Sequence, residues 1–96
     1  MNKLDMEDQR NEIFKRDAYC CRHCGMSIFR HGTPQIAHGI AKSKHALKKY
    51  GDSVINHPLN LFSTCSLYCN SRKNIGNNPV KVIEMVDRIR DALLQE

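Results

Sequence analysis

Apolar residues recur at three- and four-residue steps near the C-terminus, which is the period of a helix with one buried face. This apolar stripe consists of Val82, Ile83, Val86, Ile89 and Leu93. A proline suits the first turn of a helix, because the amide hydrogen that it lacks would have no partner there. The pattern predicts a helix from Pro79 to about Leu94 that covers the core; the alternative is a dimer interface.

The N-terminal third predicts a helix followed by a tight turn. Residues 4–16 are charged and rich in helix formers, and their few apolar anchors are Leu4, Ile13 and Phe14. We expect this helix to pack at its C-terminal end. Residues 18–25 combine aromatic residues with cysteines and end in a glycine, which is typical of a metal-binding knuckle rather than a regular element.

The middle of the chain predicts short strands. Ile28–Phe29 and Gln35–Ile40 flank a turn at Gly32–Pro34, so they predict a hairpin whose second strand carries His38. The lysine-rich segment 41–57 predicts a long functional loop, with one helical turn over His45–Tyr50.

A short apolar stretch, Pro58–Phe62, is expected to lead into a helix that carries Cys65, Cys69, Asn70 and Lys73. Gly76–Pro79 would end that helix, since glycine and proline commonly follow a helix terminus. The whole chain of 96 residues is short enough for one domain. We predict a single α+β domain with an N-terminal helix (1–17), a central core (18–78) and a C-terminal helix (79–96).

Formal charge is concentrated in the same central segment. Residues 1–19 and 79–96 each sum to −1, whereas residues 20–78 hold eight basic residues against Asp52 alone, a charge of +7. Such a field attracts polyanions, and contacts to phosphates supply the sequence-independent part of nucleic-acid affinity. The alternative is a solvated face that keeps the protein soluble.

Cysteine usage indicates the compartment and a metal. The five cysteines are odd in number, and the charged N-terminus has no apolar signal segment, so a reducing cytoplasm fits better than a disulfide framework. No apolar run is long enough to cross a bilayer, so we expect no membrane association.

Two cysteine pairs have the spacing of a structural zinc site. Cys21-x2-Cys24 and Cys65-x3-Cys69 would supply four ligands from two short loops, as tetrahedral Zn²⁺ requires. Cys20 or His23 as a substitute ligand, or four buried free thiols, are the alternatives. A site closed by four ligands leaves no position for water, so this zinc would stabilise the fold and take no part in chemistry.

The order of four segments resembles the HNH endonuclease family. These are Cys21–Gly25, Ile36–Ile40, Asn60–Cys65 and Cys69–Lys73, and the resemblance covers about residues 18–75. It implies the small ββα-metal fold with a structural zinc site and flanking helices. It also implies a DNA endonuclease that hydrolyses phosphodiester bonds with a divalent ion, Mg²⁺ or Mn²⁺, and leaves 5′-phosphate and 3′-hydroxyl ends.

The resemblance also assigns roles to particular residues. His38 would be the general base, which suits an imidazole because it titrates near neutral pH. Asn60 would steady the loop and orient the histidine, and Asn70 would bind the catalytic ion. The residues expected to contact DNA phosphates are Lys42, Lys44, Lys48, Lys49, Arg72 and Lys73.

One position departs from the family pattern. Many members carry Asp or His just before the base, as a second metal ligand, and here that residue is Ala37. Mg²⁺ keeps several waters, so Asn70 with water and substrate phosphate would suffice; otherwise His57, His45 or Gln35 completes the shell, or activity is lost. Tyr50 is either a stacking residue or a buried loop anchor.

Two other functions use the same features. One is a zinc-ribbon module that binds DNA without cutting it, as an accessory of a phage or mobile-element complex. The other is a structural subunit that dimerises through residues 79–94, or binds a partner protein of such a complex. The nuclease interpretation places the protein in the cytoplasm of a bacterial or phage-infected cell, acting on duplex or branched DNA.

Overall fold

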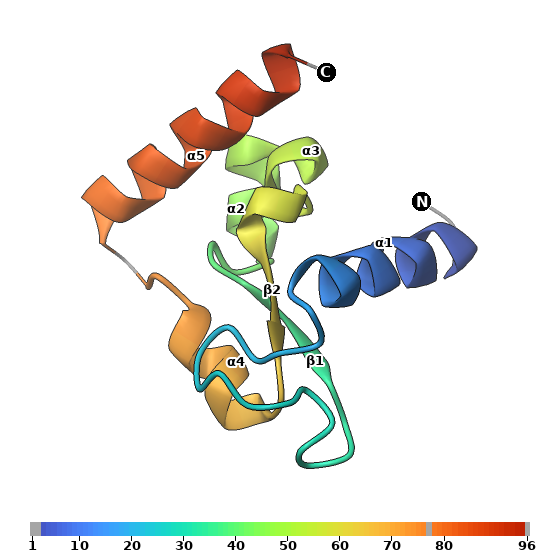
Figure 1. Ribbon diagram of the computed structural model, residues 1–96. Coiled ribbons are helices and arrows are strands. Elements are labelled where there is room, and N and C mark those ends of the chain that lie inside the picture. Colours follow the sequence, from blue (N-terminus) through green and yellow to red (C-terminus); the bar gives the residue numbers. More distant parts are fainter. Residues whose placement is uncertain (1–2, 77, 96) are drawn as a thin grey trace.

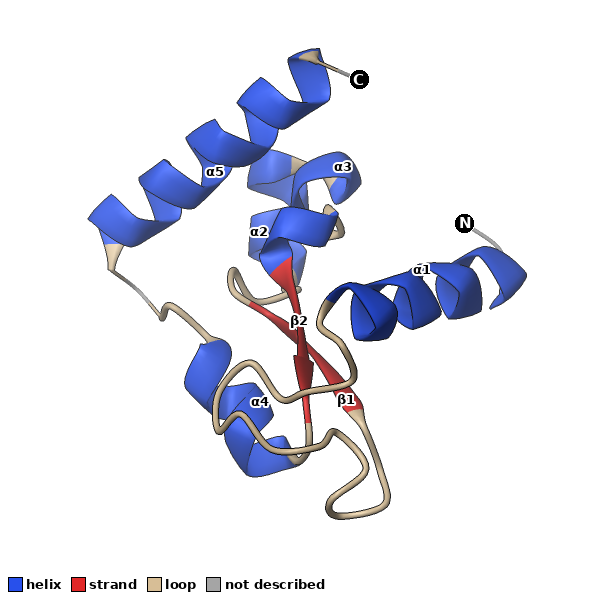
Figure 2. Cartoon of the chain, viewed as in Figure 1, coloured by secondary structure: helices blue, strands red, loops and turns tan. Residues whose placement is uncertain are grey.

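A two-stranded antiparallel sheet lies at the centre of the structure, a computed structural model that describes residues 3–76 and 78–95. The helices surround this sheet (Figures 1 and 2). The elements in chain order are α1 (Lys3–Arg16), β1 (Gln35–His38), α2 (Lys44–Tyr50), α3 (Asp52–Ile55), the 3-10 helix η1 (Pro58–Asn60), β2 (Leu61–Thr64), α4 (Leu67–Lys73) and α5 (Pro79–Leu94). The prediction of a small α+β fold is confirmed.

The strand partner of β1 differs from the predicted hairpin. β1 pairs with β2, in a register that runs from Gln35 opposite Thr64 to His38 opposite Leu61. Ile28 instead donates its amide hydrogen to the carbonyl of Tyr19, at 3.0 Å, because the chain folds back on the knuckle there. The hairpin prediction was therefore wrong in its first strand and right in placing His38 on a strand.

The two terminal helices agree with the sequence pattern. α5 spans Pro79–Leu94 as predicted, and the Asn78 side chain caps it by accepting hydrogen bonds from the amides of Val80 and Lys81. One member of the predicted stripe is misplaced, because Ile83 is 59 % exposed while its neighbours pack inward. The side chain of Leu4 in α1 lies outside the described part of the structure.

The segment 41–57 is more regular than the predicted loop. It forms α2 and α3, which meet at Gly51, whose φ of 87° suits glycine. Tyr50 is partly buried and packs against the hydrophobic core, as a loop anchor would. Further along, Cys65 precedes α4 instead of lying on it, and α4 ends at Lys73, before the expected stop at Gly76–Pro79. Asn77 within that stop is outside the described residues.

Two clusters of buried apolar side chains lie at opposite ends of the sheet. The first lies between α5 and the α2–α3 pair and consists of Ile40, Ala46, Val54, Ile55, Val86 and Ile89. The second consists of Cys21, Cys65 and Cys69, beside α4. α4 packs on both strands and α1 packs on β2 (Figure 1). Within the described residues, no helix is both long and apolar enough to span a membrane.

Asp17 joins α1, the knuckle and β2 through a buried carboxylate. Its side chain is 1 % exposed and accepts hydrogen bonds from Arg16, from Arg22 and from the amide of Ser63. Burial raises the pKa of Asp17, but these donors outweigh that effect and hold the pKa well below its usual range.

Asp17→Asn is expected to lower the free energy of unfolding by about 2–4 kcal/mol, which allows for the partial exposure of both arginines. The carboxylate stabilises the fold above its unfolded pKa of about 3.9, and this contribution is lost as pH falls towards the folded pKa. Urea unfolding at pH 7 and pH 3.5 measures both effects. Asp8→Asn, at an exposed position of α1, serves as control. An equal loss in the two variants would contradict the role of Asp17.

Candidate functional site

Four cysteines come together where the knuckle meets the start of α4. The sulfur atoms of Cys21, Cys24, Cys65 and Cys69 all lie within 4.8 Å of one another, and three of the four residues are buried. A tetrahedral Zn²⁺ with four thiolate ligands at about 2.3 Å needs donor atoms about this close. The predicted ligand set is thus assembled, and it could hold a metal ion such as zinc.

Local backbone geometry turns the two cysteine pairs towards each other. Ala18 and Tyr19 both adopt positive φ, 55° and 58°, and Gly25 has φ of 80°, so the chain reverses tightly around Cys21. On the other side, the hydroxyl of Ser66 caps α4 by accepting the amide hydrogen of Cys69 at 3.2 Å. Each pair is therefore fixed by its own turn or helix cap.

The thiols of this cluster differ in acidity. Burial raises the pKa of Cys21, yet hydrogen bonds from neighbouring backbone amides, those of Cys24, His23 and Cys65, bring it down to about 6. Burial and the adjacent thiols raise the pKa of Cys65 to about 12. One thiolate thus forms readily near neutral pH, and a divalent cation would have to displace the remaining protons as it binds.

The alternative ligands lie outside the cluster. Cys20 is exposed, and its sulfur lies 3.5 Å from the carbonyl oxygen of Ala18. His23 is also exposed, with its ring edge-on to that of Tyr68 at 6.2 Å. Among the described His, Cys, Asp and Glu residues, only the four predicted cysteines form a group that could hold an ion.

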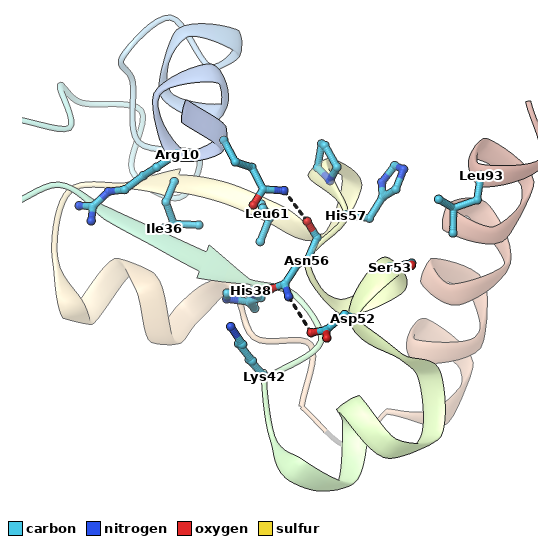
Figure 3. Close-up of a pocket in the computed structure, with 12 residues that line it drawn as sticks. Arg10, Ile36, His38, Lys42, Asp52, Ser53, Asn56, His57, Leu61 and Leu93 are labelled. Atoms are coloured by element: carbon cyan, nitrogen blue, oxygen red, sulfur yellow. Dashed lines mark hydrogen bonds between the residues drawn. The ribbon is translucent and has the colours of Figure 1, made fainter. Parts of the chain in front are cut away.

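His38 is half-buried at the end of β1 and lines a cavity of about 680 Å³ (Figure 3). Its Nε2 atom lies 3.3 Å from Oδ1 of Asn56. Burial lowers the pKa of His38 below 6.5, the Asn56 hydrogen bond raises it, and the charge of Lys42 lowers it further. The imidazole is therefore neutral at pH 7 and available as a proton acceptor.

Asn60 is fully buried and ties the loop that follows β1 to the end of α3. Its Oδ1 accepts the amide hydrogen of Ile40 at 2.7 Å, and its Nδ2 donates to the carbonyls of Ile40 and Ile55, at 3.1 and 2.8 Å. These are the bonds that a residue steadying this loop would make. Because Ile55 directly precedes Asn56, they also fix the backbone that carries the partner of His38.

Gly39 allows Asn60 to approach the strand. A Cβ atom at Gly39 would lie 3.0 Å from Oδ1 of Asn60 and 3.2 Å from the ring of Phe62. Gly39→Ala is therefore expected to lower the free energy of unfolding by about 1–3 kcal/mol and the Tm by at least about 4 °C. Differential scanning calorimetry measures the shift. An unchanged Tm would mean that the Asn60 loop gives way without cost.

Asn70 lies on α4 and contacts β1. Its Nδ2 donates to the carbonyl of Ile36 at 3.3 Å, two positions before His38. Its Oδ1 makes no hydrogen bond to any described residue, so a carbonyl oxygen of the type that hard cations bind is left available. Ala37, at the position of the missing ligand, is completely buried. Asn70 is not among the residues that line the cavity of His38, and the roles assigned to His38, Asn60 and Asn70 stay predictions.

The predicted phosphate-binding residues occupy three places. Lys42 lines the cavity of His38. Lys44, Lys48 and Lys49 are exposed on α2. Arg72 and Lys73 lie in the last turn of α4. Cζ of Arg72 lies 4.8 Å from the ring centroid of Tyr68, and Nζ of Lys73 lies 4.7 Å from that of Phe62.

Sequence reasoning missed Asn56, the hydrogen-bond partner of His38. Its Nδ2 donates to Oδ1 of Asp52 at 3.1 Å, and its own carbonyl accepts from Nε2 of Gln9 at 2.7 Å (Figure 3). The spacing of Asp52 and Asn56 is that of one helical turn, which would have been visible had α3 been predicted. His57 caps η1 by accepting the amide hydrogen of Leu59 at 3.1 Å.

Comparison with protein-family models, with curated proteins and with solved structures found no match for this chain.

Proposed function

We propose that the protein is a divalent-metal-dependent DNA endonuclease of the HNH type. The observation that carries the proposal is the setting of His38: a neutral, half-buried imidazole, held by an amide, at the wall of a cavity that Lys42 and Arg10 also line. Neutral histidine beside cationic side chains suits proton abstraction next to a phosphate. Asn60 and Asn70 stand at the spacings that the family resemblance requires.

In the proposed mechanism, His38 takes a proton from the water that attacks phosphorus. Lys42 and Arg10 attract the phosphate backbone into the cavity. The Oδ1 of Asn70 would hold a divalent ion, together with water and substrate oxygens, since Mg²⁺ needs few protein ligands. When bound, that ion would offset the negative charge that develops on the scissile phosphate and the leaving oxygen.

The basic residues of α2 and α4 would hold flanking phosphates. Contacts of this type position DNA without reading bases, so we expect little sequence preference. The four-cysteine cluster supports the proposal indirectly, because it would fix α4, and with it Asn70, against the sheet.

Supercoiled plasmid tests this function. Zinc-loaded protein is incubated with plasmid in Mg²⁺, in Mn²⁺ and in EDTA, and the products are separated on an agarose gel. Nicked or linear DNA that forms only with the divalent ion supports the nuclease. Retarded but intact plasmid under all three conditions, with a branched substrate also intact, would favour the non-catalytic zinc-ribbon module.

A further inference from the structure

A chain of two hydrogen bonds links the one carboxylate of the central segment to His38. Oδ1 of Asp52 accepts from Nδ2 of Asn56 at 3.1 Å, and Oδ1 of Asn56 lies 3.3 Å from Nε2 of His38. Asp52 begins α3 and Asn56 caps its other end, whereas His38 belongs to β1. Figure 3 shows the three side chains in a row, with the amide of Asn56 between Asp52 and His38; all three residues line the cavity.

The donor and acceptor chemistry of this row fixes the proton on the imidazole. An ionised carboxylate only accepts hydrogen bonds, so Asp52 must face the NH₂ group of the Asn56 amide. The amide oxygen then faces His38 and can only accept, so the hydrogen must be on Nε2 of His38. The carboxylate thus removes the usual ambiguity in the orientation of an asparagine amide and in the tautomer of a histidine.

Independent contacts hold Asn56 in place. The side chain of Gln9 in α1 donates a hydrogen bond to the backbone carbonyl of Asn56 at 2.7 Å. The backbone amide of Asn56 donates to the carbonyl of Asp52 at 2.9 Å. The preceding residue, Ile55, is bound by Asn60 at 2.8 Å. The amide plane of Asn56 is therefore presented to His38 by a fixed backbone.

We propose that Asp52 and Asn56 are positioning residues that hold His38 as the Nε2–H tautomer, so that Nδ1 is the atom that accepts the proton from water. Nδ1 of His38 makes no hydrogen bond within the described part of the chain, as a proton acceptor requires. The proposal rests on the nuclease function for its catalytic meaning, but the tautomer itself is a property of the free protein.

Nitrogen-15 NMR of the histidine rings tests the tautomer without DNA. Zinc-loaded, ¹⁵N-histidine-labelled protein is measured at pH 8, where His38 is neutral, and the His38 signals are identified by their loss in His38→Gln. We expect a single Nε2–H tautomer in the wild type and a mixture with Nδ1–H in Asn56→Ala and in Asp52→Ala. Ser53→Ala, at an exposed position of the same helix, is the control and is expected to keep the wild-type signature.

Thermal melting of each variant shows that it is folded. A substantial Nδ1–H population in the wild type would overturn the proposal. So would a wild-type signature in both Asn56→Ala and Asp52→Ala when these variants are folded. The activity assay adds a second readout: Asn56→Ala should lower kcat about 10- to 100-fold with little change in KM, because a misplaced base affects the chemical step.

Failure of the two proposals can be told apart. If the wild type shows the single tautomer but never cuts DNA, the nuclease function fails while the positioning role of Asp52 and Asn56 stands. If the wild type cuts DNA, and Asn56→Ala and Asp52→Ala keep both its tautomer and its kcat, the positioning role fails while the nuclease function stands.

Discussion

Cys65→Ser is expected to leave the protein without a cooperative thermal transition. Cys65 is 1 % exposed and belongs to the four-cysteine cluster, with its sulfur 3.6 Å from that of Cys24 and 3.8 Å from that of Cys69. A structural zinc contributes about 10–16 kcal/mol to small zinc-binding domains, as much as the entire stability of a typical domain, about 5–15 kcal/mol. A chain this short buries too little surface to replace that contribution.

Circular dichroism melting and the zinc content of the purified protein measure this effect. Cys20→Ser is the matched control, because Cys20 is adjacent in sequence but exposed and outside the cluster. We expect it to change stability by no more than about 0.5 kcal/mol and to keep one zinc per chain. A strong chelator should unfold the wild type in the same way as Cys65→Ser. A normal melt for Cys65→Ser, with a wild type free of metal, would show that the cluster consists of free thiols.

His38→Ala is expected to lower the rate of DNA cleavage by about 10²–10⁴-fold, the usual contribution of a general base. DNA binding should be nearly unchanged, because the removed imidazole is neutral at the assay pH. Single-turnover cleavage and gel retardation separate the two quantities. His31→Ala, at an exposed position of the central basic segment, is the control. Equal cleavage by both variants would exclude His38 as the base.

The pH dependence gives a sharper check of the same residue. The proposed base would act in its neutral form, so the cleavage rate should fall as pH drops through the pKa of His38. Burial and Lys42 place that pKa below 6.5, against the effect of Asn56, so the rate should hold at pH values where an ordinary histidine is already charged. Lys42→Gln should move the acidic limb of kcat to higher pH. A limb above pH 7 in the wild type would contradict this assignment.

Patterns among residues close together in the sequence were sufficient to predict part of this structure. The apolar period and Pro79 predicted α5 from Pro79 to about Leu94, as observed, since helix boundaries depend on local periodicity and capping. The spacing of Cys21 with Cys24 and of Cys65 with Cys69 predicted the four-cysteine cluster, because two close pairs of thiols are a common way to supply four ligands to a tetrahedral ion.

Other features depended on contacts between distant residues. The short run at Ile28 looked like a strand, but its partner is the knuckle, and the true partner of β1 lies more than twenty residues further along. The misplaced Ile83 shows the same limit, since a helical period marks apolar positions without saying which face will meet the core.

The sequence by itself thus determined the C-terminal helix, the four cysteines that could hold a metal ion, the strand position of His38 and the concentration of positive charge between residues 20 and 78. Only the tertiary structure decided that β1 pairs with β2, that Asn60 binds Ile40 and Ile55, and that Asp52 reaches His38 through Asn56. The physical reason is range: periodicity, capping and ligand spacing act within a few residues, whereas the surroundings of His38 are brought together by packing across the whole fold.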